Sequence, residues 1–501
     1  MTRLHLGVLA DEAAARRDPD HRSLLFEGRW WTTGELHDRV TRIAGGLTAL
    51  GLAPGDRLVL VMATTPDVGV LYQACWRAGL VATPVLFLLP PQELRHVLLD
   101  SGAAAVVTTP EFVANVQQAA EGLDLRIVLD GELEGTVPLA DLASGDPAGI
   151  VDRADDDLAA LLYTGGTTGR AKGVELTHAN LWHAGRAGYE ATTDDRLART
   201  LVPLPLAHAF GLLVTVTGAH DPDPSVAVLQ RWFDPVASCE LIAEHRLEQA
   251  TLVPTMLRVL LTLPLETYDL SSLQRVVCGS APLPPAVLRE FEQRVPSVTV
   301  CEGYGLTETA AAATVNRRTA RKVGTVGQAL PGTELRIVDD AGDPVPAGTP
   351  GEVWIRSAAT ARGYRGEVDG HDTFRADGWV RTGDVGALDE DGFLTILDRL
   401  KDLVIRNGFN IYPRDVEEAL AEHGSVAAAA VVGRPDDEVG EEIVAFVQAA
   451  PGVDDLDAEE LRAWARERLG PKSYPRDVRV IDALPLTPVL KIDRKSVRGL
   501  L

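Results

Sequence analysis

The chain has 501 residues, of which 46% are hydrophobic, and its 72 acidic and 48 basic residues give a formal net charge of −24. Because one hydrophobic core rarely serves so long a chain, we expect two or more domains. A strongly negative chain without a run of lysine or arginine is a poor match for nucleic acid or an anionic membrane, so neither is expected as the main partner.

Two further features bear on location. The N-terminus lacks a basic segment followed by a long apolar run, so no secretory signal is expected. The longest apolar stretch, 79–89, contains Pro84 and falls well short of the roughly 20 residues of a membrane span. The cysteines are too far apart to indicate a metal site or a disulfide framework, which favours reduced thiols in a cytoplasmic protein: Cys75, Cys239, Cys278 and Cys301. The protein is expected to be a monomer or a homodimer.

The first part of the chain alternates between two kinds of pattern. Apolar segments at 56–62, 81–86 and 103–109 predict strands, and the segments between them, 65–79 and 91–102, predict helices. Strands separated by helices indicate a parallel sheet covered by helices, that is, an α/β fold. Ligands of such folds bind beyond the carboxyl ends of the strands.

A loop rich in glycine and threonine follows the next apolar run, in LLYTGGTTGRAKGV at 161–174. Its glycines can adopt positive φ and turn consecutive backbone N–H groups toward an anion. It is not a Walker loop, because its lysine stands between alanine and glycine. Taken alone, the segment has a less favoured alternative, a tight surface turn with a solvated lysine. The residues expected to hold phosphate are Thr164, Gly165, Gly166, Thr167, Thr168, Gly169 and Lys172.

The motif GYGLTET at 303–309 is a second candidate for nucleotide binding. Tyr304 offers an aromatic face between two glycines, which suits a flat base, and Thr307 and Glu308 place a hydroxyl and a carboxylate on the next turn. A carboxylate beside phosphates needs a cation, and magnesium is usually held by one or two carboxylates together with phosphate oxygens. The alternative is an ordinary glycine-rich turn between a strand and a helix.

The last part of the chain changes character. Turn-rich short strands are predicted at 333–356, and the segment after about residue 400 is large enough for a domain of its own. Its predicted elements are a helix at 413–424, strands near 427–433 and 442–449, a helix at 458–469 and a strand near 477–481.

Three polar residues in this part are candidates for nucleotide contacts. Asp384 in RTGD follows a tight turn and suits ribose hydroxyls, and Arg399 in DRLKD suits a phosphate or a hydroxyl. Lys491 lies in LPLTPVLKIDR, close to the C-terminus. Each has an ordinary alternative, since an aspartate often caps a turn and a lysine near a terminus is usually solvated.

In this order and at these separations, the phosphate loop, GYGLTET, RTGD, DRLKD and the late lysine resemble the adenylate-forming superfamily. That superfamily includes acyl-CoA synthetases, peptide-synthetase adenylation domains and beetle luciferases. The resemblance extends from about Trp30 to Lys495 and includes LPLAHAFG at 204–211, VPTM at 253–256, GSAPL at 279–283 and VGTVGQALPG at 323–332.

The resemblance implies an α/β fold with a large N-terminal domain, 1–400, of helix-covered sheets and a β-rich subdomain. A small mobile α+β C-terminal domain, 401–501, is expected to carry Lys491 and to rotate about Lys401. The implied enzyme is an AMP-forming acid:CoA ligase. A carboxylate attacks the α-phosphate of ATP, pyrophosphate leaves, and the thiol of coenzyme A then attacks the acyl-adenylate.

The resemblance also assigns roles, with ATP, magnesium, coenzyme A and a small carboxylic acid as the implied ligands. Catalysis is expected from Lys491, Glu308, Thr307 and Lys172, with magnesium on Glu308, because these groups stabilise the charge that develops on phosphorus and pyrophosphate. Beyond the phosphate loop, the nucleotide is expected to contact Gly279, Ser280, Ala281, Pro282, Tyr304, Asp384 and Arg399. The implied acyl pocket comprises His208, Phe210, Val253, Thr255, Cys278, Gly303 and Gly305. The implied coenzyme A path comprises Arg406, Asn407, Gly408 and Phe409.

The chain departs from the family pattern in several places. Gly165 and Ala171 replace a serine and a proline of the phosphate loop, which keeps the amides but loosens the turn. Leu490 replaces the glycine before the late lysine, so the loop that seats Lys491 is altered. The polar segment 219–225 replaces an apolar passage. It could reshape the acyl entrance or a dimer surface, but a tolerated surface loop is the favoured interpretation.

Two alternative functions remain open. The acyl group could pass to a carrier-protein thiol or to an amine in place of coenzyme A. The chain could instead bind an acyl group or a nucleotide without turnover, although retention of both Glu308 and Lys491 speaks against this. A luciferase-like oxygenase ranks last. No motif identifies the acid.

Overall fold

The computed structural model describes residues 3–164, 171–192, 196–366, 372–450, 452–453, 455–486 and 492–501. Contacts within the chain define two compact units. The first comprises Met1–Leu335 and Ile355–Val380, and the second comprises Arg336–Trp354 and Arg381–Leu501. The predicted boundary at residue 400 separates two domains that are expected to move relative to each other, and it stays a prediction.

An eight-stranded sheet in the first unit confirms the predicted alternation of strands and helices. Its order is β19-β9-β8-β4-β3-β5-β6-β7, and the strands from β8 through β7 pair in parallel. The strands are β3 (Arg57–Val61), β4 (Val81–Pro84), β5 (Ala103–Thr108), β6 (Arg126–Leu129), β7 (Val137–Pro138), β8 (Leu158–Thr164), β9 (Lys172–Thr177) and β19 (Gly363–Tyr364). The two predicted helices between them are α3 (Pro66–Arg77) and α4 (Pro91–Ser101).

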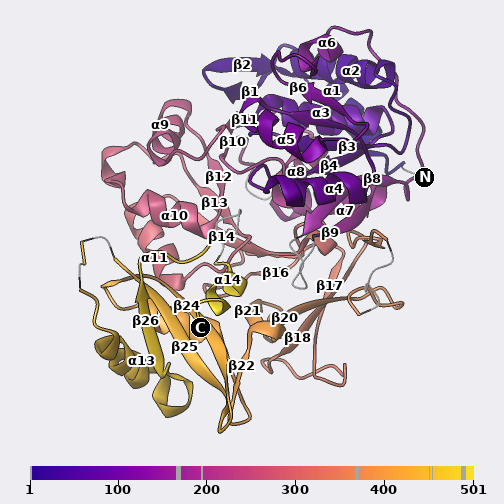
Figure 1. Cartoon of the computed structure of the whole chain (residues 1–501). Helices are drawn as coiled ribbons and strands as arrows, with labels where there is room; N and C mark the ends of the chain where they lie inside the picture. The colour runs from indigo at the N-terminus through magenta and orange to yellow at the C-terminus, as the bar shows by residue number, and fades with distance from the viewer. Residues whose placement is uncertain are drawn as a thin grey trace. The chain divides into compact units, whose positions relative to one another are not determined.

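A nine-stranded sheet forms the other half of this unit, in the order β16-β15-β14-β13-β12-β10-β11-β1-β2. Figure 1 shows α9, α10 and α11 beside its central strands. The helices are α9 (Pro235–His245), α10 (Pro254–Leu261) and α11 (Pro285–Arg294). The strands are β1 (Arg22–Phe26), β2 (Arg29–Thr32), β10 (Arg199–Val202), β11 (Val226–Leu229), β12 (Gln249–Leu252), β13 (Arg275–Cys278), β14 (Thr299–Tyr304), β15 (Thr314–Val315) and β16 (Gln328–Ala329).

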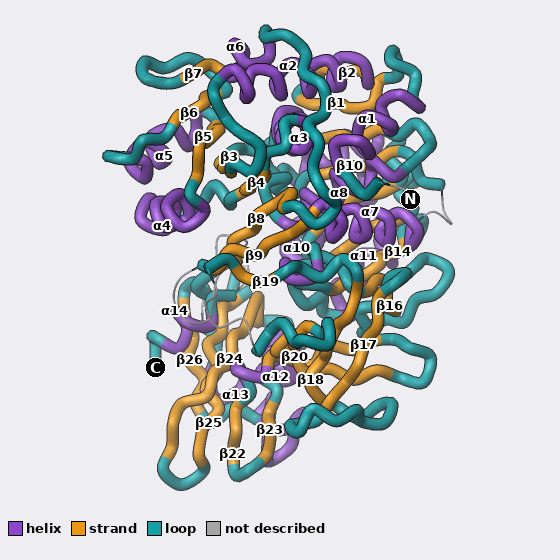
Figure 2. Tube along the Cα trace, turned by 90° about the vertical axis from the view of Figure 1, so that its right-hand side faces the viewer, coloured by secondary structure: helices purple, strands orange, loops and turns teal. Residues whose placement is uncertain are grey.

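The alternation of side chains along β3 explains the layers. Leu58 and Leu60 belong to a core that also contains residues of α3, α8 and the nine-stranded sheet, whereas Val59 and Val61 point to the opposite face and pack with α4 and α5. Both faces of the sheet are therefore apolar, as parallel sheets require. Figure 2 shows α4 and α5 beside β5 and β6. The remaining helices of the unit are α1 (Leu6–Arg16), α2 (Thr33–Ala49), α5 (Val113–Ala120), α6 (Leu139–Ala143), α7 (His178–Thr192) and α8 (Ala209–His220).

Two buried histidines dock the first helix on α7. The rings of His5 and His178 stack with centroids 4.3 Å apart, and both residues are fully buried. His178 Nδ1 accepts a hydrogen bond of 3.3 Å from the Leu6 amide, and His5 Nδ1 accepts one of 3.1 Å from the Gly7 amide. Both rings therefore act as acceptors at the start of α1.

The second unit contains two sheets. Strands β17, β18, β20 and β21 form a four-stranded sheet, and the five-stranded sheet has the order β23-β22-β25-β24 with β26 paired to β25. Helices α12 and α13 pack on one face of the five-stranded sheet and α14 on the other. The elements are β17 (Thr333–Val338), β18 (Gly351–Ser357), β20 (Val380–Leu388), β21 (Leu394–Arg399), β22 (Val404–Arg406), β23 (Phe409–Ile411), α12 (Pro413–Ala421), β24 (Val426–Asp436), β25 (Gly440–Ala449), α13 (Ala458–Ser473), β26 (Asp477–Ile481) and α14 (Arg494–Arg498). The α+β prediction for this segment is confirmed.

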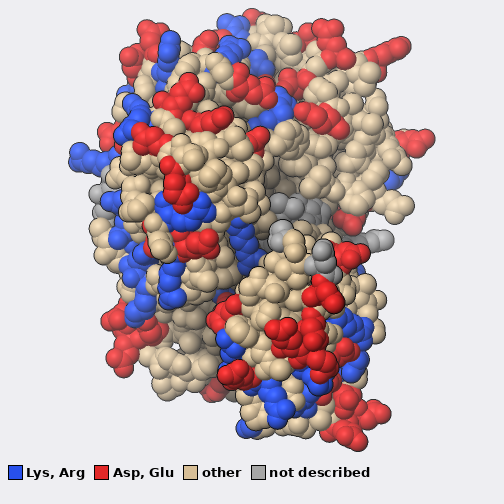
Figure 3. All heavy atoms as spheres, turned by 90° about the vertical axis from the view of Figure 1, so that its left-hand side faces the viewer, with Lys and Arg blue, Asp and Glu red and all other residues tan. Residues whose placement is uncertain are grey.

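Three further properties complete the description. Basic and acidic side chains are interspersed on the face shown in Figure 3. Among the described helices, none combines the length and the apolar character that crossing a bilayer requires. The four cysteines are free thiols, and each is buried.

Candidate active site

The phosphate loop connects two neighbouring antiparallel strands. Thr164 ends β8, Lys172 begins β9, and the two residues are partners in register. The loop therefore closes a hairpin whose base is fixed by the sheet. The other predicted phosphate contacts, at 165–169, lie outside the described residues, and their roles stay predictions.

Lys172, Tyr364 and Glu308 form a contiguous polar group beside this loop. The Lys172 Nζ lies 5.1 Å from the centroid of the Tyr364 ring, in the range of a cation–π contact. The Tyr364 hydroxyl donates a hydrogen bond of 2.7 Å to Glu308 Oε1. Tyr364 thus links Lys172 and Glu308, which were both predicted to be catalytic.

Tyr364 was not predicted from the sequence. It lies on β19, which pairs with β9 so that Tyr364 is the partner of Val174, two residues after Lys172. The signal that could have found it is ARGYRGE at 361–367, a glycine and an aromatic residue between arginines after a strand. Burial, and next the negative charge of Glu308, raise the pKa of Tyr364 far above its ordinary value. The hydroxyl therefore remains a donor at neutral pH.

The turns after β13 and β14 contain unusual backbone. Ser280 has φ 71°, Ala310 has φ 52° and Ala311 has φ 82°, in the left-handed region that non-glycine residues rarely adopt. Each such residue costs about 1–3 kcal/mol, and such strain clusters at functional sites. These turns follow the carboxyl ends of parallel strands, where α/β folds bind ligands. They include the predicted adenine contacts 279–282.

The glycines of GYG permit close backbone approach. A Cβ on Gly305 would lie 2.5 Å from both the Ala311 carbonyl oxygen and the Ala312 Cα, and a Cβ on Gly279 would lie 3.1 Å from the Gly303 carbonyl oxygen. The two glycine-containing turns are thus packed together. Tyr304 ends β14, and Thr307 and Glu308 follow in a short 3-10 helix, Thr307–Thr309.

The predicted acyl-pocket residues occupy two different environments. His208 caps α8 through a hydrogen bond of 3.4 Å from the Phe210 amide to its Nδ1. Phe210 packs against the cores on both sides of the nine-stranded sheet, and Val253 packs against the core beneath α10. Cys278 is fully buried in that same core, and burial raises the pKa of its thiol. The acyl roles of these residues, and those of Thr255, Gly303 and Gly305, stay predictions.

In the second unit, Asp384 and Arg399 form an ion pair. They are register partners on β20 and β21, and Arg399 Nε lies 3.0 Å from Asp384 Oδ1. The Asp384 side chain is only 5% exposed, whereas that of Arg399 is 49% exposed. The two predicted nucleotide contacts are thus brought together. Burial, and next the charge of Arg399, lower the pKa of the predicted hinge residue Lys401.

The predicted coenzyme A residues form a hairpin. Asn407 and Gly408, with φ 51° and 75°, are the two turn residues between β22 and β23, as the Asn-Gly preference of two-residue hairpins predicts. Arg406 forms an ion pair of 2.9 Å with Glu442 on β25. Phe409 is 47% exposed, and the Lys472 Nζ lies 3.9 Å from its ring centroid. An exposed glycine turn with an aromatic neighbour suits close passage of a chain-like ligand.

Lys491 and Leu490 lie outside the described residues, so their roles stay predictions. The helix that follows them, α14, is firmly anchored within the second unit. Arg494 donates hydrogen bonds of 2.6 and 2.9 Å to the two carboxylate oxygens of Glu417 on α12, and one of 2.8 Å to the Val431 carbonyl on β24. Arg498 donates one of 2.7 Å to Asp402, next to Lys401.

The polar segment 219–225 lies against the end of α1. Arg17 donates hydrogen bonds of 2.8 and 2.9 Å to the carbonyls of Gly218 and Asp221, and His21 Nε2 lies 3.1 Å from the Ser225 carbonyl oxygen. These contacts are with α1 and the segment that follows it. The first two residues of the polar segment, Ala219 and His220, belong to α8 and His220 is buried, so the predicted surface loop is limited to 221–225.

Comparison with known proteins agrees with this arrangement. The family model described as AMP-binding enzyme matches residues 11–365, and the model described as AMP-binding enzyme C-terminal domain matches 415–491. A feruloyl-CoA synthase from Amycolatopsis sp is 37% identical over 490 residues, covering 97% of this chain and 96% of that protein. The 4-coumarate–CoA ligase 5 of Oryza sativa subsp. japonica is 32% identical, covering 98% and 93%. The structure of the amide bond synthetase McbA from Marinactinospora thermotolerans matches with a TM-score of 0.89 and 31% identity, covering 99% of this chain and 100% of that one.

Proposed function

Because this chain belongs to the AMP-binding enzyme family, within the adenylate-forming superfamily, we propose that its site activates an aromatic carboxylic acid for transfer to coenzyme A. The chain is an AMP-forming acid:CoA ligase: ATP and the acid give an acyl-adenylate with release of pyrophosphate, and the adenylate then gives the acyl-CoA. The aromatic preference is supported by the names of the feruloyl- and 4-coumarate-activating relatives.

The Lys172–Tyr364–Glu308 group is the observation that carries the proposal. In adenylation, negative charge grows on phosphorus and on the departing pyrophosphate, so groups that stabilise it must be held in place beforehand. Lys172 stands at the base of the phosphate loop, and Tyr364 orients one oxygen of Glu308. No general base is required in this step, because the attacking carboxylate is already ionised at neutral pH.

Magnesium is part of the proposal. No group of three or more His, Cys, Asp or Glu side chains able to hold a metal occurs in the described part of the chain. A single carboxylate, Glu308, fits magnesium that is otherwise ligated by phosphate oxygens and water, as is usual for nucleotide-bound magnesium. Bound there, the ion would neutralise phosphate charge. Asp384 and Arg399 would hold the ribose, and Lys491 would act in adenylation.

Two candidates are considered for the group that accepts the acyl group from the adenylate. The hairpin with Gly408 at its turn supports coenzyme A, because the position is exposed and a Cβ there would meet no atom within 4 Å. An amine acceptor is the second candidate, favoured by the structural similarity to an amide bond synthetase.

Buried free thiols throughout the described chain support a reducing compartment such as the cytoplasm.

The test is a product analysis. Purified protein is incubated with ATP, magnesium and ferulate, and with coenzyme A, a carrier protein or an amine in separate reactions. We expect feruloyl-CoA together with AMP. Formation of an amide or an acyl carrier protein without acyl-CoA would reassign the acceptor, and AMP formation with aliphatic acids alone would reject the aromatic preference.

A further inference from the structure

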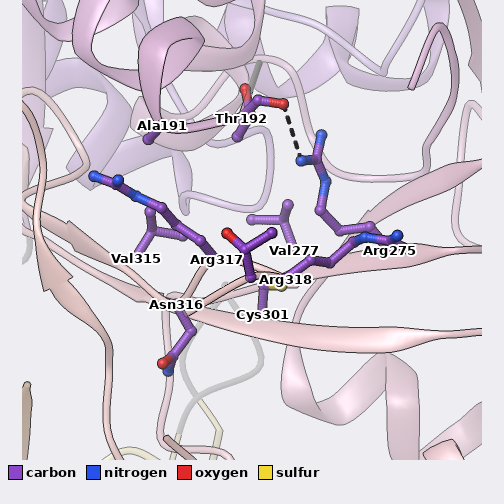
Figure 4. Close-up of a pocket in the computed structure, with 10 residues that line it drawn as sticks. Ala191, Thr192, Arg275, Val277, Cys301, Val315, Asn316, Arg317 and Arg318 are labelled. Atoms are coloured by element: carbon purple, nitrogen blue, oxygen red, sulfur yellow. Dashed lines mark hydrogen bonds between the residues drawn. The ribbon is translucent and has the colours of Figure 1, made fainter. Parts of the chain in front are cut away.

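A pocket lies on one face of the nine-stranded sheet, upstream of the strand ends at which the acid is expected to react (Figure 4). Its lining comes from the end of α7, from β13, β14 and β15, and from the residues that follow β15. Three of the lining side chains are arginines in a chain with a net charge of −24. The residues used below are Thr192, Arg275, Val277, Cys301, Arg317 and Arg318.

Strand geometry connects this pocket with the reaction site. Val277 and Cys301 are partners in register on the parallel strands β13 and β14, so their side chains share one face. Gly279 and Gly303 lie two residues further along, at the carboxyl ends of the same two strands. Arg275 lies four residues before Gly279, or about 13 Å along the strand. Arg275 therefore lies at the end of its strand that is remote from the reaction site.

Two of the arginines have neutral acceptors among their hydrogen-bond partners. Arg275 donates hydrogen bonds of 3.1 and 2.5 Å to Gln249 Oε1 and one of 3.2 Å to the Thr192 carbonyl. Arg318 donates one of 3.2 Å to the Gln274 carbonyl. These bonds orient the guanidinium groups without changing their charge.

Arg317 differs, because its Nε is buried and has no hydrogen-bond partner among the described residues. A buried donor left unsatisfied destabilises the folded protein, and an acceptor on a ligand would remove that cost. Figure 4 shows Arg317 and Arg275 on opposite sides of the pocket. No aspartate or glutamate belongs to the described lining.

We propose that Arg317 is a specificity-determining residue and that the preferred acid carries a second anionic group, such as a carboxylate, at the end remote from the reacting carboxyl. A carboxylate can accept two parallel hydrogen bonds from one guanidinium, which a neutral ring substituent cannot. The inference rests on the proposed function for the position of the reacting carboxyl. It adds that the end of the acid remote from the reacting carboxyl is negatively charged, which no motif in the sequence indicates.

The test compares three acids that share one skeleton and differ only in the para substituent: cinnamate, 4-hydroxycinnamate and 4-carboxycinnamate. Binding to the wild type, Arg317→Met and Arg16→Met is measured by titration calorimetry, which needs no turnover. Arg16 is an exposed arginine of α1 and serves as the matched control. Hydrogen bonds to a charged group contribute about 1.5–3 kcal/mol, so the wild type should bind 4-carboxycinnamate at least about tenfold more tightly than cinnamate.

Arg317→Met should abolish this ratio, and Arg16→Met should keep it. Equal binding of the three acids by the wild type, failure to bind the dicarboxylate, or an unchanged ratio in Arg317→Met would overturn the proposal. Acid-dependent pyrophosphate exchange is measured in parallel. A binding preference without exchange would reject the proposed function and leave this inference standing, whereas exchange that is indifferent to the far-end charge would do the reverse.

Discussion

Arg494 and Glu417 form a two-bond ion pair, with distances of 2.6 and 2.9 Å, which ties α14 to α12 three residues after Lys491. We infer that this pair fixes α14, the helix that follows Lys491 in the sequence, and that adenylation depends on it. Arg494→Lys keeps the charge but cannot form the planar fork, so adenylation should fall while thioester formation from supplied acyl-adenylate is retained. The two half-reactions are measured separately, with thermal unfolding as a check on folding. Equal loss of both would exclude a specific positioning role.

Tyr364→Phe should weaken the use of magnesium. The substitution removes only the hydroxyl that donates to Glu308, and a hydrogen bond to a charged group contributes about 1.5–3 kcal/mol. We expect kcat/KM for adenylation to fall about tenfold or more and the magnesium concentration for half-maximal exchange to rise. Tyr163→Phe is a matched control, because it removes a similar hydroxyl that bonds Asp100 at 2.6 Å. An unchanged magnesium dependence would remove Tyr364 from the site.

Gly408→Leu should block the thiol step and leave pyrophosphate exchange intact. The position has φ 75°, so leucine also introduces backbone strain. Gly392→Leu separates the two effects, since Gly392 has φ 79° and no atom within 4 Å of an added Cβ. We expect acyl-CoA formation to fail only in Gly408→Leu. Equal behaviour of the two variants would attribute any loss to strain and would withdraw Gly408 from the coenzyme A path.

The stacked histidines predict a specific acid sensitivity. Burial lowers the pKa of His178 to about 3 and that of His5 to about 4, from an ordinary value of 6.5. Because the folded-state pKa is depressed, each neutral ring favours the folded state fully above pH 6.5 and loses this contribution as pH falls toward the folded-state pKa. The loss is about 1.4 kcal/mol per pH unit for each histidine in that window.

The measurement is the free energy of unfolding between pH 7 and 4.5 for the wild type and His178→Asn. Asparagine can accept the Leu6 amide hydrogen bond but does not titrate. The stability of the variant should decline less steeply with falling pH. Parallel curves for the two proteins would show that His178 does not titrate on unfolding.

Local pattern accounted for most elements but not for the contacts between them. The predicted helix at 458–469 ends just before Gly470, whose φ of 73° breaks α13, because glycine is the residue that adopts this conformation at least cost. Tyr364 escaped prediction because its role depends on β19 pairing with β9, and the two are about 190 residues apart in sequence. The partly unsatisfied Arg317 escaped for the same reason, since burial depends on packing that no motif encodes.

Asp384 and Arg399 were predicted from separate motifs, and the structure shows that they form an ion pair. Both residues were predicted as nucleotide contacts, and their pairing across β20 and β21 brings them together. Strand register thus explains why two motifs 15 positions apart can serve one ligand group. Their contact with the ribose stays a prediction.

The most direct test of the account is acid-dependent exchange of labelled pyrophosphate into ATP, measured for the wild type and Lys491→Ala. We expect exchange only when acid, ATP and magnesium are all present, and a loss of about 2.7–4 kcal/mol of transition-state stabilisation in Lys491→Ala, as for removal of one transition-state donor. The variant should still convert supplied acyl-adenylate to acyl-CoA. Exchange without acid, or no exchange by the wild type with any acid, would contradict the assignment of this chain as an adenylating ligase.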